Sequence, residues 1–356
     1  MTDLSKGRIL VTGGAGFIGS ALIWELNLRG LKNILVADFL GRDEKWKNLV
    51  PLQFADYIEA DSLLERLEVS PQQFSDVRLV FHLGANSSTT ETDASHLIRN
   101  NFEYTKAMAR FALDGRRRFL YASSAATYGA LEESLPESTP LQSLRPLNMY
   151  GYSKHLFDCW AERAGILTQI TGLKYFNVFG PNEAHKADMR SVVDKAYRQI
   201  RDTGQVSLFK SYRPQFQDGE QRRDFLYVKD AVAATVFLAE QVDGGALFNI
   251  GSGQANTWRA LVNAIFQSLG QPAHINFIDM PDHLRDKYQY YTCADITKLR
   301  SFGFTQPMTP LADSVRDYVV NYLVPGRHLG DEAASPRKFQ PQIRLASSLS
   351  PLGPGQ

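Results

Sequence analysis

The sequence predicts an α/β fold: a Rossmann-type doubly wound parallel sheet with a smaller C-terminal α/β substrate domain. In the first half, short β-branched runs alternate with longer amphipathic segments. A glycine-rich turn, Thr12 to Gly19, joins the first run to the first amphipathic segment, and Asp38 ends the second run. Strands that alternate with helices form a parallel sheet with both faces covered, which is the basis of the prediction.

The elements of the first half follow in order along the chain. Arg8 to Thr12 is an apolar, β-branched run typical of a buried strand, and residues 17–29 have apolar positions at helical spacing. We expect further strands at 34–37, 77–83, 119–122 and 173–176, and helices at 94–114 and 150–164. The domain that these elements form is predicted to span residues 1–177 and to bind NAD(P).

The alternation loosens after Asn177. Helices are expected at 189–202, at 230–241 and from 257, with strands at 225–228 and 247–250 and a loop at 210–221. We predict that 178–323 is mainly a substrate-binding domain and that part of 222–255 returns to the first domain. Residues 325–356 are rich in Pro, Ser, Gly and Gln, which predicts a disordered tail.

Composition excludes several classes of protein. Of 356 residues, 44% are hydrophobic and the net charge is +1, so neither a nucleic-acid partner nor an acidic membrane surface is indicated. The two cysteines, Cys159 and Cys293, lack metal-ligand spacing, which predicts reduced thiols and no metal site. The chain shows no signal-peptide run and no bilayer-spanning stretch, so we expect a soluble, cytoplasmic protein that acts on a small molecule.

The glycine-rich turn predicts a dinucleotide site. It satisfies Gly-x-Gly-x-x-Gly at 14, 16 and 19, and Gly-x-x-Gly-x-x-Gly at 13, 16 and 19. Such glycines allow a tight turn and a close backbone approach to a pyrophosphate at the start of a helix. Asp38 stands where a carboxylate binds the adenosine ribose, which favours NAD. Arg42 and Lys45 could instead meet a 2′-phosphate, so NADP also stays open.

Two strand ends should lie beside that cofactor, because ligands of open α/β sheets bind at the carboxyl ends of the strands. Residues 83–87 are small enough for close contact with a flat ring system. Ser124 follows the strand at 119–122 and is a candidate hydroxyl donor to a substrate oxygen.

Tyr150 and Lys154 form a candidate acid/base pair. They are one helical turn apart, so both side chains leave the same face of the predicted helix. An unperturbed phenol has a pKa of about 10, and a nearby cation favours the phenolate. Tyr152 would point elsewhere on that helix.

With these residues, the chain resembles the extended short-chain dehydrogenase/reductase family. Within it, the chain is similar to the ADP-heptose 6-epimerases. The matching residues are Thr12–Gly19, Asp38, His82–Glu91, Ala122–Gly129, Pro146–Lys154, Tyr175–Lys186 and Arg223–Val228. The resemblance covers residues 8 to about 323.

The resemblance implies a homo-oligomer with one tightly bound NADP per subunit, NAD being the alternative. The cofactor residues that it implies are Gly13, Gly16, Phe17, Ile18, Gly19, Asp38, Phe39, Lys45, Leu83, Gly84, Ala85, Asn86, Ser87, Asn100, Lys154, Val178 and Lys186. The substrate residues are Asn177, Asp188, Lys195, Phe209, Lys210, Ser211, Tyr212, Arg223 and Tyr288. Phe39 and Ala60 depart from the family pattern, which has a small polar residue and a lysine there.

The implied reaction is epimerisation of ADP-heptose at carbon 6 through transient oxidation to a ketone, with hydride returned to the other face. Each face then needs its own acid/base, and the resemblance implies Tyr150 for one and Lys186 for the other. Lys154 would tune Tyr150, and Ser124 would bind the oxygen. Three alternatives remain: another nucleotide-sugar epimerase or reductase, such as a UDP-hexose 4-epimerase; a non-catalytic NAD(P)-binding regulator; or an assembly scaffold.

Overall fold

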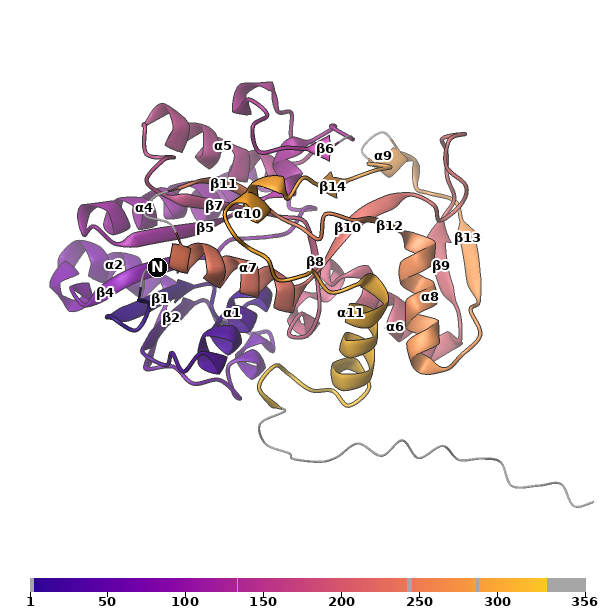
Figure 1. Cartoon of the computed structure of the whole chain (residues 1–356), viewed down its shortest axis with the longest axis horizontal. Coiled ribbons are helices and arrows are strands. Elements are labelled where there is room, and N and C mark those ends of the chain that lie inside the picture. Colours follow the sequence, from indigo (N-terminus) through magenta and orange to yellow (C-terminus); the bar gives the residue numbers. More distant parts are fainter. Residues whose placement is uncertain (1–2, 133, 242–244, 286–287, 332–356) are drawn as a thin grey trace, which may run out of the picture.

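The centre of the fold is a seven-stranded parallel sheet (Figure 1). The computed structural model describes residues 3–132, 134–241, 245–285 and 288–331. The strand order is β11-β7-β5-β4-β1-β2-β3. The bounds are β1 Arg8–Thr12, β2 Ile34–Asp38, β3 Asp56–Glu59, β4 Val77–His82, β5 Arg118–Ser124, β7 Thr171–Tyr175 and β11 Ala246–Ile250. The order reverses between β1 and β4, which is where ligands bind in open sheets.

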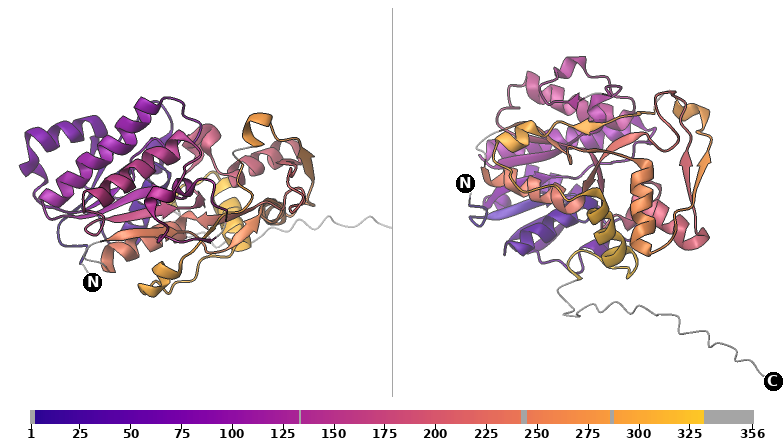
Figure 2. Two further views of the ribbon diagram at one scale, coloured as in Figure 1. Left: turned by 90° about the horizontal axis from the view of Figure 1, so that it is seen from above. Right: turned by 45° about the vertical axis from the view of Figure 1, so that its right-hand side comes forward.

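Helices cover both faces of this sheet (Figure 2). Ile9 and Val11 of β1 pack in one core cluster with α1 (Phe17–Leu28) and α7 (Val228–Gln241). Leu10 points the other way, into a second cluster with α4 (Tyr104–Asp114) and α5 (Met149–Arg163). The middle of the strand, Ile9 to Val11, is apolar because both of its faces are buried. The predicted doubly wound sheet is confirmed.

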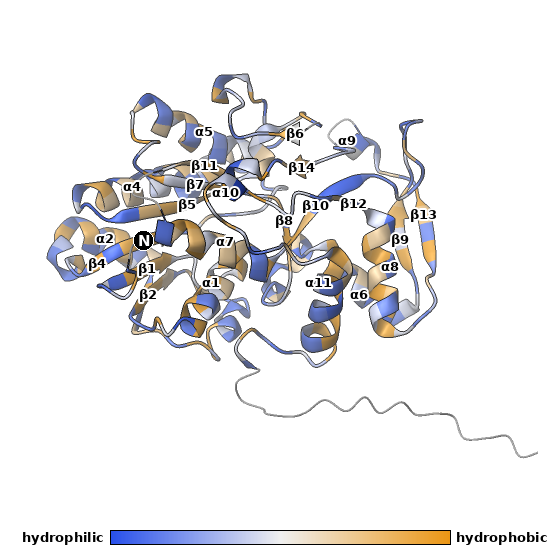
Figure 3. Ribbon diagram, in the orientation of Figure 1, coloured by the Kyte–Doolittle hydropathy of each residue, from blue (hydrophilic) through white to orange (hydrophobic). Residues whose placement is uncertain are grey.

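The remaining elements form a smaller α/β part. It contains a three-stranded sheet in the order β12-β10-β8, with β8 Asn177–Phe179, β10 Arg222–Tyr227 and β12 Ala255–Thr257. Two parallel pairs join β9 (Val206–Phe209) to β13 (Ile275–Ile278) and β6 (Ser134–Leu135) to β14 (Cys293–Ala294). Helices α6 (Val192–Thr203), α8 (Trp258–Leu269) and α11 (Leu311–Tyr318) pack together, and each carries hydrophobic and hydrophilic faces (Figure 3).

Some elements differ from the sequence-based expectation. The prediction missed β3 and the following α2 (Ala60–Val69), because β3 is a short edge strand with Ile58 as its one buried residue. The helix expected over 94–114 is interrupted by a π-helical turn, η3 (Ile98–Glu103), between α3 (Ala94–Leu97) and α4. Two further short helices, α9 (Asp282–Arg285) and α10 (Thr297–Ser301), were also missed. No helix among the described residues is long and apolar enough to cross a bilayer.

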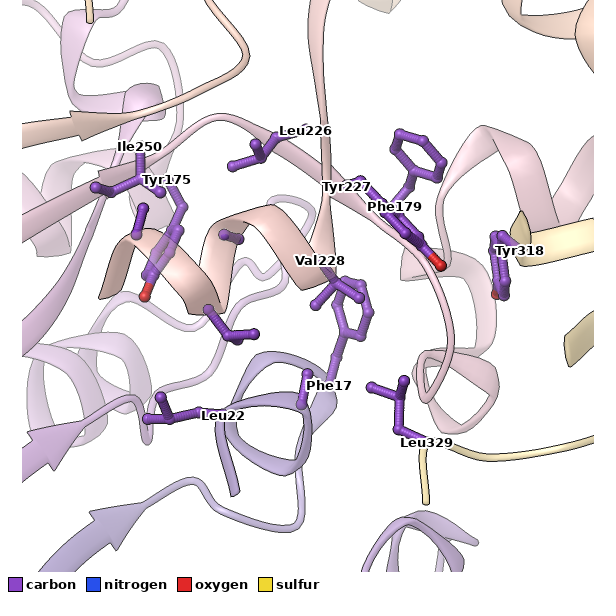
Figure 4. Close-up of a cluster of buried hydrophobic side chains, with 14 of the residues drawn as sticks. Phe17, Leu22, Tyr175, Phe179, Leu226, Tyr227, Val228, Ile250, Tyr318 and Leu329 are labelled. Carbon is purple, nitrogen blue, oxygen red and sulfur yellow. The ribbon is translucent and has the colours of Figure 1, made fainter. Parts of the chain in front are cut away.

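The predicted tail begins too early. Residues 325–331 are among the described residues, and Leu329 packs on the core: it is 0% exposed and lies beside Phe17 and Val228 (Figure 4). Its backbone N–H donates to Asn182 Oδ1 at 2.9 Å. Leu329 and its backbone hydrogen bond fix this part of the chain to the core, which composition did not indicate. The rest of the predicted tail, 332–356, lies outside the described residues.

Leu329→Ala should therefore destabilise the fold by about 2–4 kcal/mol, the usual range for emptying a buried leucine site. Urea denaturation measures this as a lower midpoint. Val324→Ala is the matched control, because Val324 is 58% exposed and its loss should change the free energy of unfolding by less than about 0.5 kcal/mol. Equal midpoints for the two variants would show that the segment is not part of the core.

Candidate active site

A cleft of about 790 Å³ opens at the carboxyl ends of β1, β4 and β5. The residues predicted to bind cofactor all line it: Gly13, Gly16, Phe17, Ile18, Gly19, Asp38, Phe39, Lys45, Leu83, Gly84, Ala85, Asn86, Ser87, Asn100, Lys154, Val178 and Lys186. Ser124 and Tyr150 line the same cleft. The structure thus gathers the predicted cofactor and acid/base residues at the switch point of the sheet.

The glycine turn fits a dinucleotide. Gly13 has φ +69°, and a Cβ there would lie 2.6 Å from the backbone nitrogen of Gly84. A Cβ on Gly19 would lie 2.0 Å from the Gly13 carbonyl oxygen. No side chain fits at either position, so the turn packs directly on the residues that follow β4. The start of α1 lines the cleft. A diphosphate can approach backbone N–H groups at such a helix N-terminus.

Asp38 lines the cleft at the end of β2. Its Oδ2 accepts hydrogen bonds from the backbone N–H groups of Ala15 (2.9 Å) and Gly16 (3.1 Å). Its Oδ1 accepts from the Phe39 N–H at 2.7 Å and from Lys45 Nζ at 3.1 Å. The carboxylate is therefore fixed at the end of β2, where an Asp receives ribose hydroxyls in dinucleotide-binding folds.

The start of α5 places Tyr150 over the turn that follows β5. Asn148 caps the helix by accepting from the Gly151 N–H at 2.8 Å. A Cβ on Gly151 would lie 2.7 Å from the Ala126 carbonyl oxygen, so the helix and the turn are in close contact. Burial raises the pKa of the Tyr150 phenol, and a hydrogen bond with Ser124 partly opposes this. The two predicted partners of the reacting oxygen are thus neighbours.

Lys154 lies one helical turn further along α5 and is buried. Its Nζ donates to the Ala122 carbonyl oxygen at 2.8 Å. Burial lowers the pKa of Lys154 to about 8, and the nearby charge of Asp158 opposes that effect. Lys154 was predicted to lower the pKa of Tyr150, and in the described structure burial of the phenol acts in the opposite direction.

A buried ion pair supports the turn that carries Ser124. Asp158 and Lys174 are 0% and 1% exposed at their side chains and lie 3.0 Å apart. Asp158 also accepts from the Ser123 hydroxyl at 2.8 Å, and Lys174 donates to the Thr127 hydroxyl at 2.6 Å. The sequence interpretation missed this pair. The available signal was the helical spacing of Asp158, four residues after Lys154.

Lys186 reaches the cleft from a different element, the short helix η6 (Ala184–Met189). Its Nζ lies 5.3 Å from the ring centroid of Phe17. Burial lowers the pKa of Lys186, the charge of Glu183 opposes this, and the charge of Lys195 adds to the lowering. Lys186 is therefore a partly desolvated amine facing the same space as Tyr150.

Most of the predicted substrate residues form a second group, in the smaller part. The Arg223 guanidinium lies 5.2 Å from the Tyr288 ring centroid, and the Phe209 ring meets Tyr288 edge-on at 6.5 Å. Lys210 Nζ and the Tyr212 hydroxyl both contact Asp279 Oδ1, at 3.2 and 3.0 Å. The set that the structure brings together is Phe209, Lys210, Ser211, Tyr212, Arg223 and Tyr288.

Of the other three predicted substrate residues, Asn177 lies next to this group, whereas Asp188 and Lys195 lie elsewhere, on η6 and α6. Asn177 is exposed at the start of β8 and donates to the Asp224 carbonyl oxygen at 3.1 Å. Asp188 is exposed in η6, and Lys195 is exposed on α6 near Lys186. Asp188 shares η6 with Lys186, and none of the three is among the described residues that line the cleft.

Comparison with known proteins decides the family. The profile of the NAD dependent epimerase/dehydratase family matches residues 9–251. The chain belongs to this family. A relative from Nitratidesulfovibrio vulgaris (strain DP4), named ADP-L-glycero-D-manno-heptose-6-epimerase, is 48% identical over 316 residues, which are 88% of this chain and 97% of the relative.

Two solved structures of epimerases are similar to this family member. The ADP-L-glycero-D-manno-heptose-6-epimerase of Helicobacter pylori superposes with a TM-score of 0.75 at 26% identity, covering 90% of this chain and 98% of that one. The UDP-glucuronic acid 4-epimerase of Bacillus cereus, in complex with UDP-glucuronic acid and NAD, gives a TM-score of 0.71 at 25% identity. The match covers 88% of this chain and 99% of that one. The family and such neighbours support a nicotinamide cofactor.

This epimerase/dehydratase cleft also contains residues that the sequence interpretation missed. Among them are Asp43, His96, Tyr104 and Met189. The Asn100 amide donates to the His96 carbonyl oxygen at 2.9 Å. The four-residue spacing of His96 and Asn100 within a predicted helix was the signal that could have placed them on one face. Met189 and Tyr104 carried no such signal.

Proposed function

We propose that the protein interconverts ADP-D-glycero-D-manno-heptose and ADP-L-glycero-D-manno-heptose by epimerisation at carbon 6, as an isomerase that supplies heptose for the lipopolysaccharide core. One observation carries the proposal: Tyr150 and Lys186 line one cleft from two separate elements. Incubation of the protein with either ADP-heptose, followed by chromatographic separation of the epimers, should give the same final mixture from both. Unchanged substrate in both incubations would contradict the proposal.

The two side chains suit an inversion because a carbon that bears a secondary alcohol without an acidic neighbour must lose hydride from one face and regain it on the other, while its hydroxyl proton is lost and regained. A bound nicotinamide supplies reversible hydride transfer. Tyr150 would exchange the hydroxyl proton in one orientation of the sugar, held by the Ser124 hydroxyl. Lys186 would do so in the opposite orientation, and its burial favours the neutral amine that can accept a proton. Lys154 would hold the ribose beside Tyr150.

The alternative functions differ in the cleft residues that they require. A UDP-hexose 4-epimerase does not require a second amine in the cleft, so Lys186 favours the heptose reaction. UDP-glucose and UDP-galactose should stay unconverted under conditions that equilibrate the ADP-heptoses. A non-catalytic regulator is expected to lack the Ser124, Tyr150 and Lys154 set, which is present.

For the cofactor we propose NADP, with Lys45 as the cation for its 2′-phosphate and NAD as the alternative that Asp38 favours. Lys45→Ala should weaken NADP binding tenfold or more, because a charge-assisted hydrogen bond contributes about 1.5–3 kcal/mol. Binding of NAD, which lacks that phosphate, should change by less than about threefold. Titration calorimetry of nucleotide-free protein measures both. Equal losses of affinity for the two dinucleotides would show that Lys45 pairs with Asp38 and does not contact the 2′-phosphate.

We also propose a cytoplasmic, homo-oligomeric enzyme. Cys159 and Cys293 are free thiols, which fits a reducing compartment. Light scattering after size exclusion measures the number of subunits.

A further inference from the structure

We propose that Asn48 is a positioning residue that joins the adenosine end of the cofactor cleft to the loop that carries Lys186. The proposal rests on the proposed function in one respect, the role of Lys186 as an acid/base. Asn48 was not among the predicted site residues and does not line the cleft itself.

The side chain of Asn48 links two separate elements. Asn48 is 2% exposed and ends the short helix η1 (Lys45–Asn48). Its Nδ2 donates to the Ala15 carbonyl oxygen in the glycine turn at 3.0 Å and to the Asn182 carbonyl oxygen at 3.1 Å. It also lies 3.3 Å from Nδ1 of His185. An amide carries two N–H donors, so one hydrogen is shared between the contacts on the Lys186 loop.

The same short helix touches the adenosine end. Lys45, at its first position, pairs with Asp38, and Asn48 is at its last. The charges of Asp43 and Lys45 act on His185, which confirms that this end of the cleft is close to the loop. Burial lowers the pKa of His185 to about 4, so its ring is neutral at pH 7 and a ring nitrogen can accept from Asn48.

The loop needs such support because its backbone is strained on both sides of Lys186. Asn182 has φ 77°, and Ala187 has φ 47° with ψ −122°. Non-glycine residues hold such conformations when surrounding contacts fix them. The Asn182 side chain donates to the Ser20 hydroxyl at 3.0 Å and accepts from the Leu329 N–H. Asn48 supplies the anchors on the backbone of Asn182 and on His185, next to Lys186 itself.

Two consequences follow. Loss of the Asn48 amide should loosen the loop and displace Lys186 without altering Tyr150. A ligand seated on Asp38 and Lys45 should fix η1, and through Asn48 it should also fix the loop. Binding of a ligand at the adenosine end of the cleft and the position of the Lys186 side chain are then coupled.

Asn27 provides a matched control. Its Nδ2 also donates to two backbone carbonyl oxygens, of Leu31 at 3.0 Å and Gln53 at 2.8 Å. It joins the end of α1 to the segment before β3, away from the Lys186 loop. Asn27→Ala removes comparable hydrogen bonds, so it reports the cost of losing an amide bridge as such.

The first experiment is hydrogen exchange of the full-length protein followed by mass spectrometry, with and without NADP⁺. Backbone amides of residues 182–190 should exchange about tenfold faster in Asn48→Ala than in the wild type, and the slowing caused by NADP⁺ should fall below twofold. Asn27→Ala should match the wild type in this segment. Unchanged exchange in Asn48→Ala, or equal acceleration in Asn27→Ala, would overturn the proposal. This readout does not depend on the substrate.

The second experiment is a double-mutant cycle on ADP-heptose turnover. Asn48→Ala should lower kcat tenfold or more in the wild-type background and less than threefold in the Lys186→Met background, because it acts through Lys186. Equal losses in the two backgrounds would assign Asn48 a general structural role. If the wild type does not turn over ADP-heptose, the proposed function fails. The hydrogen-exchange result still tests whether Asn48 holds the loop that carries Lys186.

Discussion

Tyr150→Phe should lower epimerisation of ADP-heptose about a thousandfold, within the range of about 10²–10⁴ that general acid–base groups contribute. The substitution removes the phenolic oxygen that hydrogen-bonds with Ser124 and leaves the ring and the helix start in place. Because the glycine turn and Asp38 are untouched, the variant should keep its bound dinucleotide. Initial rates from each epimer measure the loss, and the absorbance of nucleotide released on denaturation measures cofactor content.

Tyr152→Phe is the control for this prediction. Tyr152 is on the same helix, two residues away, and is 46% exposed. Its rate should stay within twofold of the wild type. A Tyr150→Phe enzyme with more than a tenth of the wild-type rate would show that the phenol does not exchange the substrate proton.

Lys186→Met should lower epimerisation about 10²–10³-fold, because one of the two sugar orientations then lacks a group that can exchange the hydroxyl proton. Methionine keeps an unbranched apolar side chain at this position beside Phe17 and removes the amine. Lys186→Arg should fail as well, because a guanidinium stays protonated and cannot accept a proton. Chromatographic assays in both directions measure these losses.

Lys47→Met is the control for this second prediction, since Lys47 pairs with the exposed Glu44 outside the cleft. It should retain the wild-type rate. If the Lys186→Met variant kept the wild-type rate, Tyr150 would be the single acid/base. That result would favour the alternative function, a UDP-hexose 4-epimerase.

The sequence was sufficient for the large sheet because its buried strands contain short apolar runs, such as Ile9–Val11, separated by amphipathic helices. It was insufficient for β3, β8 and β12, which are short and only partly buried. The order of the smaller sheets depends on pairing between distant segments, such as β9 with β13. No local pattern encodes such pairing.

The cofactor end of the site could be predicted because its residues lie in contiguous motifs, from Gly13 to Gly19 and from Leu83 to Ser87. The contact of Asn48 with Asn182 could not, because it joins residues far apart in the chain, and the Asp158–Lys174 pair depends on how the strand and the helix pack. The direction of the Tyr150 pKa was also beyond the sequence, since it depends on how completely the phenol is buried.

The buried Asp158–Lys174 pair has a consequence for how this protein can evolve. Removing either partner leaves an uncompensated charge in the core, which typically costs about 3–5 kcal/mol, a large part of the stability of most domains. Single substitutions at either position should therefore be purged by selection, and viable change requires both positions to change together. We expect descendants of this sequence to inherit the two residues as one unit, even where the nucleotide-facing surface diverges.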